Sequence, residues 1–132
     1  MNGPAADTAT CVVSVCRGCC CGNAELRPGI DHDALLTDLG KRLGADGKVR
    51  VTGCLWVCGD ANVVVVSPRP EARRTGARPV WLAQVDHPDV SALIAAWVAA
   101  GGPGLAPMPR ALRPHLSRPF EHPDAPVRRA RA

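Results

Sequence analysis

Cysteine is the residue type in this chain best suited to chemistry. The 132 residues include seven cysteines, with three in a row in CRGCCCG at 16–22 and two in GCLWVC at 53–58. Thiolates of this kind bind Zn²⁺ and iron–sulfur clusters. An odd number of cysteines with three in a row suits a disulfide framework poorly, so the pattern indicates metal or redox chemistry. The seven are Cys11, Cys16, Cys19, Cys20, Cys21, Cys54 and Cys58.

The sequence carries no export or membrane signal. Its first ten residues, MNGPAADTAT, lack a basic stretch followed by an apolar run, and no segment approaches the roughly 20 apolar residues of a membrane span. We therefore expect a cytoplasmic protein without a membrane partner. Because the cytosol keeps thiols reduced, this location also favours metal binding over disulfides.

Composition and charge narrow the class of partner. The chain is 46% hydrophobic and 21% charged, which is ordinary for one globular domain, and it is only 3% aromatic. Few side chains can stack on bases, so no nucleic-acid partner is expected. Residues 1–100 hold equal numbers of acidic and basic side chains, whereas 101–132 hold six arginines and two acids. This excess predicts docking to an acidic surface of a redox partner protein.

Hydrophobic patterning predicts alternating strands and helices. Apolar runs predict strands at 10–16, 48–53, 62–67 and 79–85, and helical spacing of apolar residues predicts helices at 31–43 and from Pro88 to Gly101. Asp31 is the expected N-cap of the first helix. The segment between the last two strands, SPRPEARRTGAR at 67–78, is too rich in Pro, Arg and Gly to be regular.

The order of these elements predicts the fold. A right-handed crossover through the first helix would set the first two strands parallel, and the last two strands would form a hairpin. The result is an α/β sandwich of thioredoxin-like type, with a four-stranded mixed sheet and two main helices.

Three regions are expected along the chain: a flexible N-terminus at 1–9, the domain at 10–102 and a Pro/Arg-rich C-terminal extension at 103–132. Seven of the 13 prolines lie in the extension. Its apolar residues predict a ribbon lying on the domain or on a second copy in a homodimer. They are Leu105, Met108, Leu112, Leu116 and Phe120.

The predicted topology brings several thiols to one place. Parallel strands end at the same edge of a sheet, so Cys16 and its loop should lie beside Cys54 and Cys58. Cys11 lies five residues upstream in the same strand, roughly 16 Å away, and is expected to be a buried hydrophobic residue. The resulting pattern is C-x4-C, a gap of 32 residues and C-x3-C, which suits Zn²⁺ or an iron–sulfur cluster.

The second half of this pattern resembles a known family. GCLWVCGDANVVVVSP, followed by a strand, HPDV and an amphipathic helix ending in Gly-Gly, is similar to the thioredoxin-like [2Fe-2S] ferredoxins. The C-x4-C spacing also resembles the small iron–sulfur subunit of respiratory complex I. The resemblance covers about 10–102, although CRGCCCG is shorter than in stand-alone ferredoxins and has two extra cysteines. Residues 105–120 resemble the end of uncharacterised predicted metal-binding proteins, whose first pair can be C-x2-C.

The resemblance implies a ligand set. Cys16, Cys54 and Cys58 would bind a [2Fe-2S] cluster, with Cys21 as the fourth ligand. Cys19 is the alternative to Cys21, and Cys20 is a weaker one.

The implied function is a low-potential one-electron carrier and not an enzyme, because four thiolates leave no open position on the irons. Trp56, inside the C-x3-C loop, is either a lid or partner contact or simple packing. The histidines at 32, 87, 115 and 122 are expected to be solvated or to cap helices.

Two alternatives remain open. The first is a metal-binding or iron–sulfur cluster-handling protein that uses the CRGCCCG loop. The second is a thiol–disulfide oxidoreductase, which is disfavoured because no helix begins after a C-x2-C, and such a helix N-terminus is what lowers a thiol pKa in that chemistry.

Overall fold

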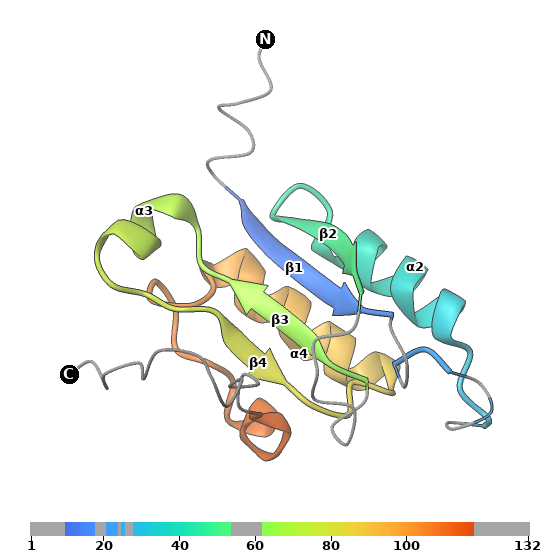
Figure 1. The fold of residues 1–132 in the computed structure, drawn as a ribbon. Coiled ribbons are helices and arrows are strands. Elements are labelled where there is room, and N and C mark those ends of the chain that lie inside the picture. The colour runs from blue at the N-terminus through green and yellow to red at the C-terminus, as the bar shows by residue number, and fades with distance from the viewer. Residues whose placement is uncertain (1–9, 18–20, 24, 26–27, 54–61, 118–132) are drawn as a thin grey trace, which may run out of the picture.

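The computed structural model describes residues 10–17, 21–23, 25, 28–53 and 62–117. They form an α/β fold with one four-stranded mixed sheet (Figure 1). The elements are β1 (Cys11–Cys16), α2 (His32–Leu43), β2 (Gly47–Thr52), β3 (Val64–Ser67), α3 (Pro70–Arg74), β4 (Val80–Leu82), α4 (Pro88–Ala100) and the 3-10 helix η2 (Arg110–His115). No helix in these ranges is long and apolar enough to cross a membrane.

The strand order in the sheet is β2-β1-β3-β4. β1 runs parallel to β2 and antiparallel to β3, and β3 runs antiparallel to β4. The predicted parallel first pair and antiparallel last pair are therefore confirmed. Cys16 lies opposite Thr52, so the C-terminal ends of β1 and β2 meet at one edge of the sheet.

The two long helices lie on one face of the sheet (Figure 1) and contact each other. The carboxylate of Asp31 accepts a hydrogen bond from the N–H of Ala34 at 3.0 Å, which confirms Asp31 as the N-cap of α2. The ring of His87 caps α4 by accepting the N–H of Asp89 at 3.2 Å. α4 ends at Gly101, whose φ of 134° is outside the range that other residues adopt readily.

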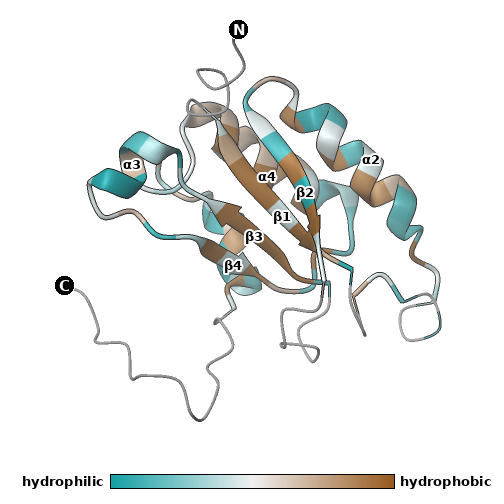
Figure 2. Cartoon of the chain, turned by 45° about the horizontal axis from the view of Figure 1, so that its top comes forward, coloured by the Kyte–Doolittle hydropathy of each residue, from teal (hydrophilic) through white to brown (hydrophobic). Residues whose placement is uncertain are grey.

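The core between sheet and helices is aliphatic. Its strand residues alternate along β1 and β3, which are strongly hydrophobic in Figure 2. The buried members are Cys11, Val13, Val15, Leu39, Leu43, Val64, Val66, Leu82, Val85, Val90, Ile94, Ala95, Trp97, Val98 and Leu112. Since neighbouring strand residues point to opposite faces, Cys16 lies on the sheet face away from the helices.

The segment at 67–78 is not irregular throughout, as the sequence suggested, because it contains the short helix α3. Pro70 occupies the first turn, where its fixed φ favours a helix and its missing N–H costs nothing. Glu71 in the first turn and arginines in the last turn complement the helix dipole. Ala72 is buried, which attaches this turn to the domain.

The fourth strand is shorter than the predicted range of 79–85 and ends at Leu82. The backbone turns at Gln84, which has a φ of 53°. Ala83 then donates to the carbonyl of His115 and Val85 donates to the carbonyl of Asn62. β4 therefore pairs with β3 over only three residues, and the chain then forms hydrogen bonds with His115 and Asn62.

The described part of the C-terminal extension packs on the domain as a ribbon. Leu112 in η2 is fully buried, and Leu116 forms a bridge with Leu82 of β4. The indole N–H of Trp97 donates to the carbonyl of Ala106 at 3.0 Å. Leu105 and Leu116 are about half exposed, and Phe120 lies outside the described residues. Residues 103–117 therefore cover part of the core rather than trailing from it.

Candidate metal centre

Two of the predicted ligands, Cys16 and Cys21, come together at the end of β1. Both are buried, with 2% and 5% of their surface exposed. They pack with Val63, Val65 and the partly buried Trp81 in a small cluster separate from the main core. The thiol of Cys21 therefore lies next to the thiol of Cys16.

Backbone groups fix both sulfurs. The N–H of Val63 donates to Cys21 Sγ at 3.3 Å, and Cys16 Sγ donates to the carbonyl of Gly53 at 3.5 Å. The N–H of Cys16 donates to the carbonyl of Val63 at 3.0 Å. A backbone N–H aimed at sulfur stabilises the thiolate, which is the form that binds metal.

The environment keeps Cys21 protonated in the metal-free protein. Burial is the main cause, and it raises the pKa of the Cys21 thiol to about 12. The Val63 N–H lowers this pKa, the Cys16 thiol raises it further, and the Arg17 charge lowers it. Metal binding at this thiol must therefore release a proton, and the cation supplies the positive charge that makes the thiolate stable.

The other predicted ligands lie outside the described residues, as do Cys20 and Trp56. They are Cys54, Cys58 and the alternative Cys19. The described chain stops at Gly53, whose carbonyl contacts Cys16 Sγ, and resumes at Asn62, which contacts the Cys21 loop. Gly53 and Asn62, which flank the segment 54–61, thus both lie at the edge where the two thiols are.

Asn62 joins the segments around this edge and was not identified from the sequence. It is 1% exposed. Its Oδ1 accepts the N–H of Gly22 at 2.6 Å, and its Nδ2 donates to Asp86 Oδ1 at 2.9 Å and lies 3.1 Å from His32 Nδ1. The available signal was an asparagine directly before the apolar run VVVV, where a buried polar side chain needs partners.

We expect Asn62→Ala to lower the free energy of unfolding by about 2 kcal/mol or more, because it leaves buried groups of Gly22, His32 and Asp86 without this partner. Urea denaturation at matched metal content measures the loss. The control is Asp38→Ala, which removes an exposed ion pair with Arg42 on α2 and should cost about 1 kcal/mol at most. Equal losses in the two variants would contradict the role given to Asn62.

Among the described residues, Arg17 Nε and His32 Nε2 are buried N–H groups without an acceptor. Asn62 Nδ2 donates to His32 Nδ1, so the ring proton is assigned to Nε2. A buried donor without an acceptor costs about 1–3 kcal/mol. Arg17 contacts the cysteine loop at Cys16 and Gly22, so an anionic sulfur-rich group there would supply an acceptor for its Nε–H, and this residue fits an iron–sulfur cluster. Within the described ranges no three metal-binding side chains come together.

Cys11 lies in the main core, away from this pair. It is fully buried, its Sγ is 3.7 Å from the carbonyl of Gly101, and a Cβ at Gly102 would lie 2.6 Å from it. Burial raises the pKa of this thiol. These observations agree with the expected role of a small buried hydrophobic residue.

The histidines have varied roles. His87 caps α4 as expected, and His115 Nδ1 lies 3.0 Å from the carbonyl of Ala83. His32 is neither solvated nor an N-cap, because it is buried and bonded to Asn62. His122 lies outside the described residues.

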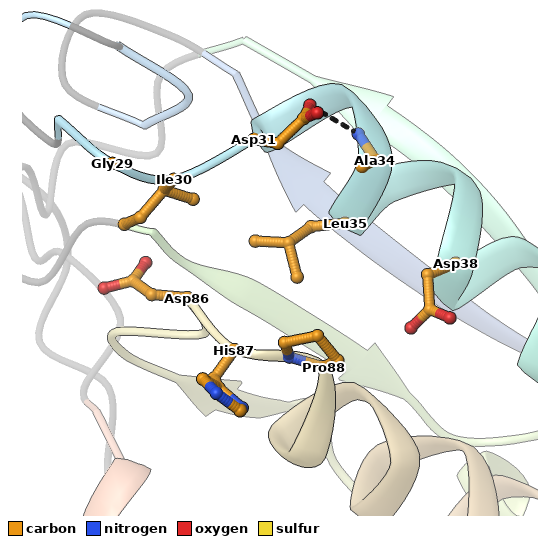
Figure 3. A pocket seen from close by; sticks show the side chains of 9 residues that line it. All are labelled: Gly29, Ile30, Asp31, Ala34, Leu35, Asp38, Asp86, His87 and Pro88. Carbon is orange, nitrogen blue, oxygen red and sulfur yellow. Dashed lines mark hydrogen bonds between the residues drawn. The ribbon is translucent and has the colours of Figure 1, made fainter.

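A hollow of about 420 Å³ opens between the first turns of α2 and α4 (Figure 3). It is lined by apolar side chains such as Leu35 and by the carboxylates of Asp31, Asp38 and Asp86. Asp86 also accepts hydrogen bonds from Asn62. The side chain of Asn62, which bonds both Asp86 and Gly22, therefore connects the hollow to the cysteine loop.

Comparison with known proteins adds no relative: no family model matches the chain, and no match was found among curated proteins or among solved structures. The features that bear on function are therefore the α/β fold and the buried thiol pair at its sheet edge.

Proposed function

We propose that this protein is a low-potential one-electron carrier that holds a [2Fe-2S] cluster on Cys16, Cys21, Cys54 and Cys58. The observation that carries the proposal is the buried contact of Cys16 with Cys21 at the edge where the segment 54–61 begins and ends. Covalent geometry keeps the Cα of Cys54 about 3.8 Å from that of Gly53, whose carbonyl touches Cys16 Sγ.

The donor set favours electron transfer over catalysis. A [2Fe-2S] cluster supplies one-electron chemistry when bound. Four protein thiolates fill every coordination position on the irons that the bridging sulfides leave open. The chain's own residues bury the sulfurs, aim the Val63 N–H at Cys21 and leave the Arg17 Nε–H without an acceptor among the described residues. None of these groups is arranged to move a proton to or from a substrate.

The fold is part of the same proposal. The order β1-α2-β2-β3-β4-α4, with both long helices on one face, supports a thioredoxin-like assignment and membership of the thioredoxin-like [2Fe-2S] ferredoxins. The short helix α3 and the packed ribbon at 103–117 are additions to this plan.

The second candidate is a metal-binding or cluster-handling protein that uses the CRGCCCG loop. The observation favouring it is that Cys21, which packs with Cys16, directly follows Cys19 and Cys20 in the sequence. Zinc bound by such thiols gives a colourless protein, whereas iron–sulfur clusters absorb visible light.

The proposed partner is a redox protein with an acidic docking surface, with neither nucleic acid nor membrane involved. Exposed arginines of the ribbon support it, since Arg110 and Arg113 lie on η2 beside β4. A homodimer remains a further proposal, because Leu105 and Leu116 are exposed on the same ribbon.

We expect dithionite to reduce the purified centre, with a midpoint on the order of −400 to −200 mV. An all-thiolate [2Fe-2S] centre carries net negative charge in both states, and adding an electron to it is therefore unfavourable. A redox titration followed by absorbance measures the midpoint. A value well above zero would instead indicate histidine ligation or another centre.

A further inference from the structure

Arg17 directly follows Cys16, yet its side chain turns back over the cysteine loop. Its Nη1 donates to the carbonyl of Cys16 at 2.9 Å and its Nη2 donates to the carbonyl of His32 at 3.1 Å. Its backbone N–H donates to the carbonyl of Thr52 at 3.0 Å. The guanidinium is thus held between the end of β1 and the start of α2.

The loop that carries Cys21 is shaped around this side chain. Gly22 has a φ of 72°, and a Cβ added there would collide with Arg17 Cδ and lie 3.1 Å from Nε. Only glycine allows this approach without strain. Gly22 is in turn fixed by Asn62, so Arg17, Gly22 and Cys21 form one ordered unit.

The positive charge of Arg17 lacks a negative partner within the described ranges. Its guanidinium donates there to two carbonyl oxygens, and its buried Nε–H has no acceptor among the described residues. A partly buried charge without a counter-charge is unfavourable. The guanidinium bonds the carbonyl of Cys16, and Arg17 Cδ packs against Gly22, the residue directly after Cys21. The positive charge therefore lies against the loop that carries both thiols.

We infer that Arg17 is the counter-charge of the cysteine centre and that its fixed guanidinium favours the reduced cluster. The inference rests on the proposed function and extends it to the control of the potential. Reduction adds one negative charge to a centre that is already anionic. A fixed positive charge beside it stabilises the reduced state more than the oxidised state.

The test compares Arg17→Gln, Arg17→Lys and the wild type by redox titration. We expect Arg17→Gln to lower the reduction equilibrium constant about tenfold, which is 59 mV for a one-electron centre. Arg17→Lys keeps the charge and should lie closer to the wild type. The matched control is Arg73→Gln on α3, which is exposed and follows β3 at the opposite end of the sheet from Cys16 (Figure 1). It should leave the midpoint unchanged.

A second measurement, metal binding, also applies to variants that do not retain the cluster. Cd²⁺ binding to the metal-free proteins, followed by the sulfur-to-metal absorption, should weaken in Arg17→Gln and be restored in Arg17→Lys. Equal midpoints and equal Cd²⁺ affinities in Arg17→Gln and wild type would overturn the inference and leave the proposed function standing. Equal loss in the Gln and Lys variants would also overturn it. A wild type that holds no cluster overturns the proposed function and the inference with it.

Discussion

Replacing Cys16 with serine should yield a folded protein that no longer retains an iron–sulfur cluster. The Cys16 sulfur is buried beside Cys21 at the sheet edge, and serine puts a protonated oxygen where a thiolate is needed. Cys54→Ser and Cys58→Ser should have the same effect. Iron and acid-labile sulfide per chain after anaerobic purification measure the loss, which we expect to be at least about tenfold.

Cys11→Ser is the matched control, because it makes the same substitution at the start of the same strand. Cys11 lies in the main core against Gly101 and Gly102, so the variant should keep its cluster. Loss of the cluster in Cys11→Ser alone, with retention in Cys16→Ser, would show that both the strand register and the ligand set are wrong.

The same assay identifies the fourth ligand. Cys21→Ser should weaken the cluster and alter its spectrum, while Cys19 or Cys20 retains a remnant by a shift of the glycine-flanked loop. The burial of Cys21 with Cys16 and its hydrogen bond from Val63 support this assignment. Indifference to Cys21→Ser combined with loss in Cys19→Ser would move the fourth ligand to the C-x2-C alternative.

Ending the chain after Gly102 should remove most of the stability of the domain. The deletion takes away Leu112, the bridge from Leu116 to β4 and the carbonyl that accepts the Trp97 indole N–H. Leu112→Ala alone should cost about 2–5 kcal/mol, against a typical total of about 5–15 kcal/mol. Urea denaturation followed by circular dichroism measures both losses.

Two controls accompany this prediction. Leu116→Ala, at a side chain that is 52% exposed, should cost much less than Leu112→Ala. A chain ended after Ser117 keeps every contact of the ribbon given above and should be more stable than the chain ended after Gly102. A chain ended after Gly102 that unfolds at the same urea concentration as the full chain would contradict the packing of the ribbon.

Local rules predicted the elements that local sequence determines. The β-branched run before Arg17-Gly18, the N-cap Asp31 and the helical spacing in α4 each act within a few residues, and the structure has these elements in the expected places. The crossover rule then set β1 and β2 parallel. Two of the misses depend on distant partners: β4 ends where Ala83 bonds His115, and η2 is held by burial of Leu112.

In the candidate site, too, some features were predicted from the sequence, whereas those that depend on distant contacts were not. Spacing and topology predicted that Cys16 and Cys21 lie together and that Cys11 lies elsewhere, which the structure shows. The roles of Asn62, His32 and Arg17 were not predicted, because they arise from hydrogen bonds between residues 15 to 40 positions apart in the sequence, and hydrophobic periodicity does not report such contacts. A buried polar residue is recognised only when its partners are known.

The most direct test of the central claim is the absorption spectrum of wild-type protein purified without oxygen, with its iron and sulfide content. The account predicts a red-brown protein with sulfur-to-iron bands that bleach with dithionite, and about two irons and two sulfides per chain. A colourless protein that contains zinc or no metal, and that cannot be reconstituted with iron and sulfide, would contradict it.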